Sequence, residues 1–393
     1  MTSLSAITAH AIGLRRDIHR HPELSFQENR TAGVVRGELN RLGIPWRACA
    51  QTGTVAVLGR GKPGKRIALR ADLDALPITE RTGLPYASAH EGCMHACGHD
   101  GHTASLLAAT AYLTSREADL PGPVTLLFQP AEEQGGGADH MVRAGALDEV
   151  DEVYGYHNWP PLPFGSAGCQ AGPLMAANAM FDVVITGRGG HASAPHQCVD
   201  PLVAAANAVL LAQQVVSRQI APIAAGVISF TGINGGTTYN VIPDTVRLMG
   251  TIRAMQTELR DELAARLEAT IRAAVAAAGC TATFDYRPMY PATVNDPRCA
   301  AIAAAAVERV LGTSAVTTSG LPLMASEDFS YYLQARPGCY ILLGAGRPGA
   351  VIEPCHSPRF DYNDELIPIV VRLWADLAGV PCPVSGAAVT SPG

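Results

Sequence analysis

"HACGHDGHTASLLAATAYLTS", residues 95–115, places a polar cluster directly before an apolar run that has the length of a helix. Short apolar segments lie on either side of it, "RIALRAD" (66–72) and "PVTLLFQPAEE" (123–133). Further segments of the same kind are "TVAVLG" (54–59) and "EVYGYHN" (152–158). This alternation of strand and helix patterns predicts an α/β layer with a largely buried sheet. Three of the segments end in polar side chains, and α/β sheets usually carry their sites in the loops at strand ends.

The pattern changes between residues 176 and 289, where strand-like and helical segments follow in the order β-α-β-β-α-β. This is the order of the split-βαβ unit of ferredoxin-like domains. Residues 290–382 return to a helix, a polar loop (325–333), a buried strand and a final helix, which would complete the first layer. We therefore expect one domain built from residues 1–175 and 290–382, a second domain inserted within it, and a disordered tail at 383–393.

Composition and charge exclude several classes of protein. The 35 acidic residues outnumber the 29 basic ones, and no dense basic run is present, which argues against binding to nucleic acid or to anionic membranes. No apolar stretch is long enough to span a bilayer, and the N-terminus lacks the features of a secretory signal, so we expect a cytoplasmic protein. The ten cysteines follow no disulfide framework, and free thiols are expected.

The polar cluster at residues 95–104 allows two interpretations. Cys97 and His99 are two residues apart, and a turn can aim both side chains at one point, whereas a helix would not. Alternatively, His95, His99 and His102 are capping and surface groups at the start of the following helix. A zinc finger is excluded because no second Cys/His pair follows, and a CxxC redox motif is excluded because three residues separate Cys93 from Cys97.

The rest of the chain supplies further candidate ligands. Glu132 and Glu133 follow an apolar strand directly, so one carboxylate can bind a metal while its neighbour handles protons. His157 ends another apolar strand, and His356 lies in a loop bounded by prolines. Taken singly, these would be surface carboxylates and hydrogen-bonded structural histidines. Taken together, they complete a set that suits a two-metal site with one bridging ligand: Cys97, His99, Glu133, His157 and His356.

A series of motifs from about residue 12 to 378 occurs in a fixed order: "RRDIHRHPELSFQE", "RADLDALPITE", "HACGHDGHTA", "FQPAEE", "HNWP", "GRGGHASAP", "YNVIPD", "GTIRA", "ASEDFSYY" and "HSPRFDYND". The set resembles the hippurate hydrolases, N-acyl-amino-acid amidohydrolases and plant auxin-conjugate hydrolases, a branch of the dinuclear aminoacylase/carboxypeptidase metallopeptidases. The resemblance implies a mixed-sheet α/β catalytic domain with an inserted ferredoxin-like dimerisation domain. It also implies metal-dependent cleavage of small N-acyl amino acids, such as hippurate-like or N-acetyl compounds.

The resemblance further assigns roles to single residues. It implies that two divalent ions (zinc, manganese, cobalt or nickel) are bound by the five ligands above, with Cys97 where relatives use a bridging aspartate. Glu132 would be the general base. Asp72, in "RADLDAL", would be a carboxylate that supports the ligands from behind; its plain alternative is a cap at the end of a strand.

Three further residues lie in the inserted segment. The resemblance implies that His191 donates to the developing oxyanion across a homodimer interface, and that Asn240 and Arg253 bind the carboxylate of the amino acid. The plain alternatives are a turn histidine and a solvent-exposed arginine. A dipeptidase or exopeptidase of the same architecture remains open, because the motifs do not fix the acyl pocket. A non-catalytic metal- or amino-acid-binding protein would have no need of Glu132 beside the ligand Glu133.

Overall fold

The computed structural model describes residues 3–347, 349 and 351–382; the predicted tail at 383–393 lies outside the described residues. The chain divides into two compact units. Unit 1 contains the residues up to 172, residues 294–321 and those from 328 onward, and unit 2 contains residues 173–293 and 322–327. Among the described residues, no helix combines the length and the apolar character that a membrane span requires.

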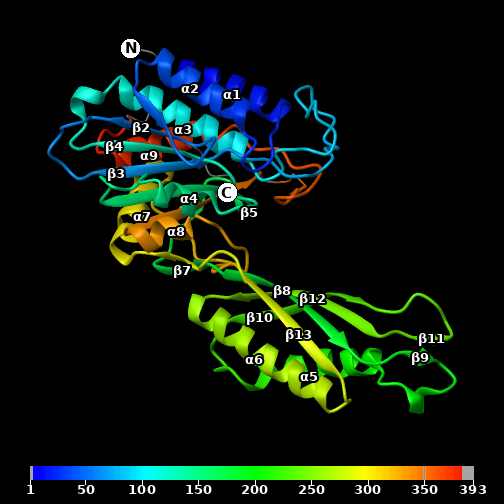
Figure 1. Ribbon diagram of the computed structural model, residues 1–393. Coiled ribbons are helices and arrows are strands. Elements are labelled where there is room, and N and C mark those ends of the chain that lie inside the picture. Colours follow the sequence, from blue (N-terminus) through cyan, green and yellow to red (C-terminus); the bar gives the residue numbers. More distant parts are fainter. Residues whose placement is uncertain (1–2, 348, 350, 383–393) are drawn as a thin grey trace. The chain divides into compact units, whose positions relative to one another are not determined.

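Unit 1 is built on a seven-stranded mixed sheet (Figure 1). Its strands, in sheet order, are β1 (Trp46–Ala48), β2 (Thr54–Leu58), β4 (Val124–Gln129), β3 (Ile67–Asp72), β5 (Glu152–Pro163), β15 (Gly338–Gly346) and β6 (Ala167–Gly168). The central strands β4, β3, β5 and β15 are parallel, and the outer three are antiparallel to their neighbours. Every residue of β3 and β4 is buried, as expected for strands covered on both faces. The predicted α/β layer is confirmed.

Helices cover both faces of this sheet. They are α1 (Leu4–Arg20), α2 (Asn29–Arg41), α3 (His99–Thr114), α4 (Gly137–Arg143), α7 (Pro297–Leu311), α8 (Ser330–Ala335) and α9 (Leu366–Leu377), with a short 3₁₀ helix at Glu117–Asp119. α3 packs on the sheet between α1 and α9, while α4 and α8 pack together on the other face (Figure 1). The loop predicted at 325–333 is partly wrong, because α8 begins within it. Phe329 and Tyr332 are buried there, which holds the segment against the sheet.

The central helix α3 is buried almost all round, and small residues allow its neighbours to approach it closely. Gly101 is the clearest case. A Cβ at this position would lie 2.3 Å from the ring of Tyr362. The Tyr362 hydroxyl in turn lies 3.2 Å from that of Ser105 and 3.0 Å from that of Tyr156. The first turn of α3 is thereby packed against the chain segment that precedes α9.

Unit 2 has a four-stranded antiparallel sheet in the order β10-β12-β8-β13, with α5 and α6 packed on it (Figure 1). Its main elements are β8 (Ala177–Thr186), α5 (Pro201–Arg218), β10 (Gly226–Asn234), β12 (Thr245–Ala254), α6 (Thr257–Ala276) and β13 (Thr281–Pro288). Smaller elements are β9 (Gly190–His191), a 3₁₀ helix at Pro195–Gln197 and β11 (Val241–Ile242). Two short strands contain the boundaries between the units in the sequence, β7 (Gly172–Met175) and β14 (Thr293–Asn295).

One face of the unit 2 sheet forms its core. Along β8, buried residues alternate with more exposed ones, which is the period of a strand covered on one face only. Phe181, Val183 and Ile185 point inward, where they pack with the small residues Ala204 and Ala208 of α5. The inserted segment therefore has a hydrophobic core of its own.

We expect Gly101→Ala to destabilise the protein by about 1–3 kcal/mol, because the added methyl group has no room beside the rigid ring of Tyr362. Urea unfolding measures the change. Gly13 of α1 is the matched control, since it is exposed and a Cβ there meets nothing within 4 Å. Gly13→Ala should be neutral or stabilising by up to about 1 kcal/mol. Equal effects at the two positions would show that helix propensity, and not the Tyr362 contact, decides the result.

Candidate metal centre

Polar side chains converge in unit 1 at the carboxyl ends of its parallel strands. Asp72 ends β3 and pairs in register with Gln129, which ends β4. β5 contributes His157, and α3 begins at His99. His356 lies in the segment before α9 with a positive φ of 69°. The polar strand ends thus lie together, at the edge where α/β sheets usually carry their sites.

The five predicted ligands form one cluster. The Sγ of Cys97 lies 3.3 Å from Nε2 of His157. Oε1 of Glu133 lies 3.4 Å from Nε2 of His356 and 4.0 Å from Nε2 of His99. Two groups of three have ligand atoms within 4.8 Å of one another: Cys97 with His99 and His157, and Cys97 with Glu133 and His356. Cys97 belongs to both groups, which is the geometry that a bridging ligand requires.

The rings of His99 and His157 are held in the orientation that metal binding requires. Nδ1 of His99 lies 2.9 Å from the carbonyl oxygen of Asp74, and Nδ1 of His157 lies 2.6 Å from that of Asn158. With Nδ1–H donating to a carbonyl, the lone pair of each Nε2 faces the cluster. Nε2 of His99 and Oε1 of Glu133 are buried and make no hydrogen bond within the described residues. The residues therefore fit a divalent cation.

The local charges show which groups hold protons when no cation is present. Burial and the neighbouring imidazole of His102 lower the pKa of His157 well below its usual value. Burial also acts to lower the pKa of His99, but the carboxylates of Asp72 and Asp74 outweigh it and raise that pKa well above its usual value. His157 is thus neutral, as a metal ligand must be, whereas His99 has to lose a proton when a cation binds.

Cys97 must also lose a proton. Hydrogen bonding to the Cys355 thiol, burial and the carboxylate of Glu133 raise the pKa of the Cys97 thiol well above its usual value. A cation at this site therefore displaces protons from both Cys97 and His99, and its affinity falls as the pH falls.

Asp74 organises the cluster, although it was not among the residues predicted from the sequence. Its Oδ1 accepts the backbone N–H of Glu132 at 3.0 Å, and its Oδ2 accepts that of Glu133 at 3.0 Å. The hydroxyl of Ser25 donates to Oδ2 at 2.7 Å. The available signal was the spacing of two between Asp72 and Asp74 after a buried strand, which places both carboxylates at the same strand end.

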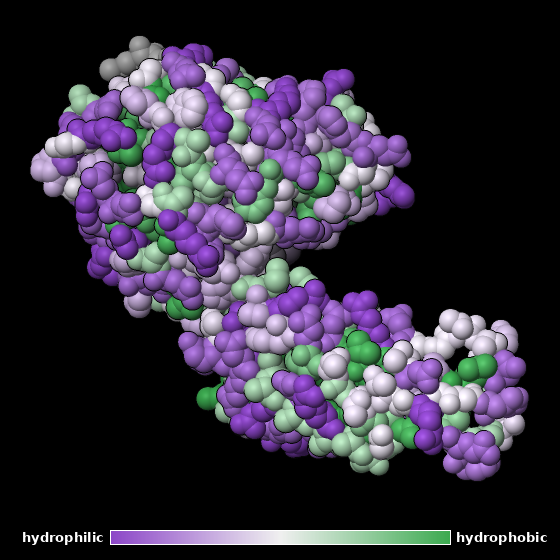
Figure 2. Space-filling model, in the orientation of Figure 1, coloured by the Kyte–Doolittle hydropathy of each residue, from purple (hydrophilic) through white to green (hydrophobic). Residues whose placement is uncertain are grey.

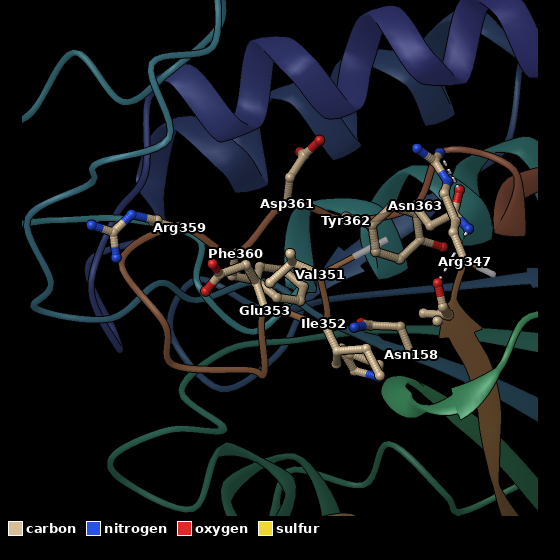
Figure 3. Close-up of a pocket in the computed structure, with 13 residues that line it drawn as sticks. Asn158, Arg347, Val351, Ile352, Glu353, Arg359, Phe360, Asp361, Tyr362 and Asn363 are labelled. Carbon is tan, nitrogen blue, oxygen red and sulfur yellow. Dashed lines mark hydrogen bonds between the residues drawn. The ribbon is translucent and has the colours of Figure 1, made fainter. Parts of the chain in front are cut away.

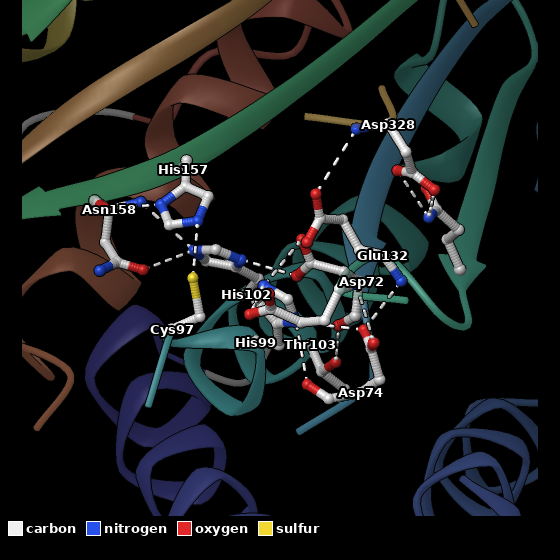
Figure 4. A network of polar contacts seen from close by, with 12 residues as sticks. Asp72, Asp74, Cys97, His99, His102, Thr103, Glu132, His157, Asn158 and Asp328 are labelled. Carbon is white, nitrogen blue, oxygen red and sulfur yellow. Dashed lines mark hydrogen bonds and ion pairs between the residues drawn. The ribbon is translucent and has the colours of Figure 1, made fainter. Parts of the chain in front are cut away.

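Asp72 contacts His102, a histidine next to the five candidate ligands and not one of them (Figure 4). Its Oδ1 lies 2.7 Å from Nδ1 of His102, whose Nε2 lies 2.6 Å from Oδ1 of Asn158. Both ring nitrogens of His102 are therefore engaged by side chains. His99 and His102 are fully buried, so the interpretation of these two histidines as surface groups is wrong. Asn158 also explains why residue 98 is a glycine. A Cβ at this position would lie only 2.2 Å from Oδ1 of Asn158.

Glu132 lies beside the candidate ligands. It is only 7 % exposed, and a carboxylate oxygen lies within 4.8 Å of the ligand atoms of His99 and Glu133. Its Oε1 is 3.5 Å from the backbone nitrogen of Asp328 (Figure 4). The carboxylate of Asp328 lies 3.1 Å from the buried guanidinium of Arg70. A second carboxylate therefore lies next to the candidate ligand Glu133, in a position suited to proton transfer.

His191 and Asn240, both in unit 2, lie at one small two-stranded ladder, in which β11 pairs with β9. His191 belongs to β9, and Asn240 directly precedes β11. The backbone N–H of Ala192 donates to the carbonyl of Asn240 at 3.0 Å. Both side chains are exposed, and Nδ1 of His191 lies 2.8 Å from the hydroxyl of Ser193, which leaves Nε2 for another partner. The ladder thus presents the two residues together.

Arg253 lies on β12 of unit 2 and is half-buried. Its guanidinium donates to the carbonyl of Met324 at 2.9 Å and lies 3.3 Å from the hydroxyl of Ser326. Burial lowers its pKa. Within the described part of the chain no carboxylate forms an ion pair with it, so its charge is available to an anionic ligand. The interpretation of Arg253 as a solvent-exposed residue is therefore wrong.

A cavity of about 240 Å³ opens beside the cluster in unit 1 (Figure 3). Its lining combines Asn158 and Tyr362 with the apolar side chain of Ile352 and the charged side chain of Arg347. Because Asn158 also contacts His102, the cavity adjoins the buried cluster. Ligand pockets commonly measure about 300–1,000 Å³, so this cavity lies just below the usual range and has room only for a small ligand.

A set of thiol, imidazole and carboxylate groups at the strand ends of an α/β sheet, with a further carboxylate beside it, is typical of metal-dependent hydrolases. The comparison with known families agrees. Residues 68–379 match the model of peptidase family M20/M25/M40. The chain belongs to this family and is a hydrolase.

Relatives match along nearly the whole chain. One is the N-acetyl-L-cysteine deacetylase of Bacillus subtilis, 41% identical over 366 residues that cover 93% of this chain and 86% of the relative. The IAA-amino acid hydrolase ILR1-like 4 of Arabidopsis thaliana is 39% identical over 93% of this chain and 84% of its own. A crystal structure of a dinuclear metal-binding M20 peptidase from Bacillus subtilis superposes with a TM-score of 0.82 at 36% identity, covering 95% of this chain and 98% of that one.

We expect Asp74→Asn to weaken metal binding by roughly 10- to 100-fold, because an amide NH₂ cannot accept the N–H groups that the carboxylate accepts. Titration of the metal-free protein with a competing chelator measures the affinity. Ser25→Ala is the matched control: it removes one hydrogen bond to the same carboxylate and should leave the affinity nearly unchanged. An unchanged affinity in Asp74→Asn would show that the loop holding Glu132 and Glu133 keeps its shape without Asp74.

Proposed function

We propose that this hydrolase is a metal-dependent amidohydrolase that cleaves the amide bond of small N-acyl amino acids, releasing the acyl carboxylate and the free amino acid. The observation that carries the proposal is the cluster in which Cys97 belongs to two groups of ligands, with Glu132 beside it. The names of the deacetylase and amino acid hydrolase relatives support the substrate class.

The proposed ligands of two divalent cations are Cys97, His99, Glu133, His157 and His356. Bound there, the cations would polarise the substrate carbonyl and acidify a water molecule. Zinc, manganese, cobalt and nickel all suit a set of thiolate, imidazole and carboxylate donors. Asp72 would support this set through its contact with His102.

Glu132 carries the proton in this proposal. As a water molecule attacks the carbonyl carbon, the Glu132 carboxylate takes its proton; the carbon–nitrogen bond then breaks, and Glu132 delivers the proton to the leaving amine. His191 donates a hydrogen bond from Nε2 to the carbonyl oxygen as negative charge develops on it. Arg253 and Asn240 bind the carboxylate of the amino acid; the absence of an ion-pair partner for Arg253 among the described residues supports its role.

We further propose that unit 2 is a ferredoxin-like dimerisation domain of a homodimer, in which His191 acts in the site of the partner subunit. Large apolar side chains are exposed along α5, among them Val203 (57 %) and Leu210 (69 %), and Figure 2 shows apolar residues on the visible surface of this unit. β10 is an edge strand and contacts α5. An apolar helix face beside an unpaired edge is a surface that a symmetric partner can cover.

The test of catalysis is Glu132→Gln. Removing the proton carrier should lower kcat by roughly 10²- to 10⁴-fold while the metal content stays that of the wild type. Glu133→Gln is the matched control, since it alters the adjacent carboxylate and should lose metal and activity together. Activity is measured on N-acetyl, N-benzoyl and longer-chain acyl amino acids beside unblocked dipeptides. Substantial turnover by Glu132→Gln would remove Glu132 from the mechanism, and a preference for dipeptides would favour the exopeptidase alternative.

The shared site is tested by mixing two inactive variants. His191→Ala and Glu132→Gln homodimers should each be nearly inactive, whereas a mixed dimer holds one site with both residues intact. Equal amounts should therefore regain about a quarter of wild-type activity, because half of the dimers are mixed and each has one working site. Native mass spectrometry of the mixture confirms that subunits have exchanged. No recovery after exchange would place His191 in its own subunit's site.

A further inference from the structure

A second thiol, that of Cys355, lies beside Cys97 and has no part in the proposed mechanism. Its Sγ lies 3.9 Å from the carbonyl oxygen of Cys97, although 258 residues separate the two along the chain. Nδ2 of Asn158 lies 3.9 Å from the same Sγ. Both cysteines are free thiols. The fold therefore brings a thiol next to the one cysteine that belongs to both ligand groups.

The backbone holds these two cysteines next to each other. The N–H of His356 donates to the carbonyl of Ala96 at 2.7 Å. Cys355 directly precedes His356, and Cys97 directly follows Ala96. The two cysteines therefore lie on adjoining backbone segments. The neighbouring Cys355 side chain is also the largest cause of the raised pKa of the Cys97 thiol. A disulfide needs its Cα atoms about 4.4–6.8 Å apart, and the His356–Ala96 hydrogen bond joins the two backbone segments directly beside both cysteines.

The two thiols differ in exposure. Cys97 is buried, whereas Cys355 is partly exposed. A small oxidant from solvent therefore reaches Cys355 first, and the Cys97 thiol lies behind it. An accessible cysteine with a second cysteine beside it is the arrangement of a reversible thiol oxidation site.

We propose that Cys97 and Cys355 form an oxidative modification site for hydrogen peroxide, which links them as a disulfide. Peroxide first oxidises the Cys355 thiol to a sulfenic acid and is reduced to water. The sulfur of Cys97 then attacks the sulfenic sulfur, a second water leaves, and the S–S bond forms. Two thiols and one peroxide thus give one disulfide and two water molecules.

The consequence for the enzyme rests on the proposed role of Cys97 as the ligand shared by both cations. A disulfide sulfur carries no charge and is a poor metal ligand, so the linked protein would lose its metals. The link also shields Cys97 from further oxidation to sulfinic acid, which thiols do not reverse. Oxidised enzyme would then be inactive but recoverable by a thiol reductant.

The experiment treats the metal-free full-length protein with hydrogen peroxide, alkylates the remaining thiols, and maps linked peptides by mass spectrometry without reduction. We expect a peptide pair joining Cys97 to Cys355. After dithiothreitol, the wild type should again bind zinc to its original stoichiometry. Cys355→Ser should bind zinc normally before treatment, form no such pair, accumulate sulfinic acid at Cys97, and fail to recover zinc binding.

Cys93→Ser is the matched control, because Cys93 is a partly exposed thiol in the same segment as Cys97. This variant should behave as the wild type. Cys355→Ala repeats the test with a side chain that lacks the hydroxyl of serine. A Cys93–Cys97 link, or sulfinic acid at Cys97 in the wild type without a link to Cys355, would overturn the inference. The proposed function fails separately: if reduced Cys97→Ala binds zinc as the wild type does, Cys97 is not a ligand, whatever the peptide map shows.

Discussion

The candidate site depends on one buried carboxylate, that of Asp74. It follows β3 but accepts hydrogen bonds from the loop after β4, and His99 at the start of α3 contacts both its carbonyl and its carboxylate. Burying a charge is costly unless donors replace the lost water. Here hydrogen bonds from the His99 ring, Ser25 and the backbone of Glu133 keep the pKa of Asp74 below its usual value despite complete burial. Each segment that Asp74 joins is therefore fixed by the same charge.

A second buried network joins the remaining parts of the site. Nδ1 of His19 on α1 lies 2.9 Å from the carboxylate of Asp100, the residue after His99. The buried guanidinium of Arg15, one turn earlier on α1, donates to Asp361 at 2.9 Å, in the segment that carries His356. Burial acts to lower the pKa of His19, but Asp100 outweighs it and raises that pKa to about 9. α1 thus connects the start of α3 to the loop before α9, which sets the distance between His99 and His356.

The sequence predicts the fold and the identity of the clustered residues better than their contacts. Strands and helices each place hydrophobic residues at a characteristic spacing, so β3, α3 and β4 are evident from the local sequence. That the polar residues at the strand ends lie together follows from the topology of a parallel sheet. The roles of Asp74, His102 and Asn158 could not be read in this way. Each depends on hydrogen bonds to residues 25–58 positions away, such as His102 with Asn158 and Asp74 with Glu132. α8 was missed for a similar reason: Phe329 and Tyr332 favour a helix only once the sheet is there to bury them.

A thiolate at the shared position gives this cluster a property that a carboxylate would not. Sulfur is the softer donor and favours ions such as zinc. The Cys97 thiol must also lose a proton to bind a cation, and Cys355, burial and the nearby carboxylates raise its pKa. Among the proposed ligands, only the thiol can be converted by an oxidant into a disulfide, since imidazole and carboxylate groups do not form disulfides. Because Cys97 belongs to both ligand groups, one covalent change at its sulfur alters both at once. The neighbouring Cys355 determines whether that change is reversible, so the redox behaviour of the site follows from a residue that binds neither metal nor substrate in the proposed mechanism.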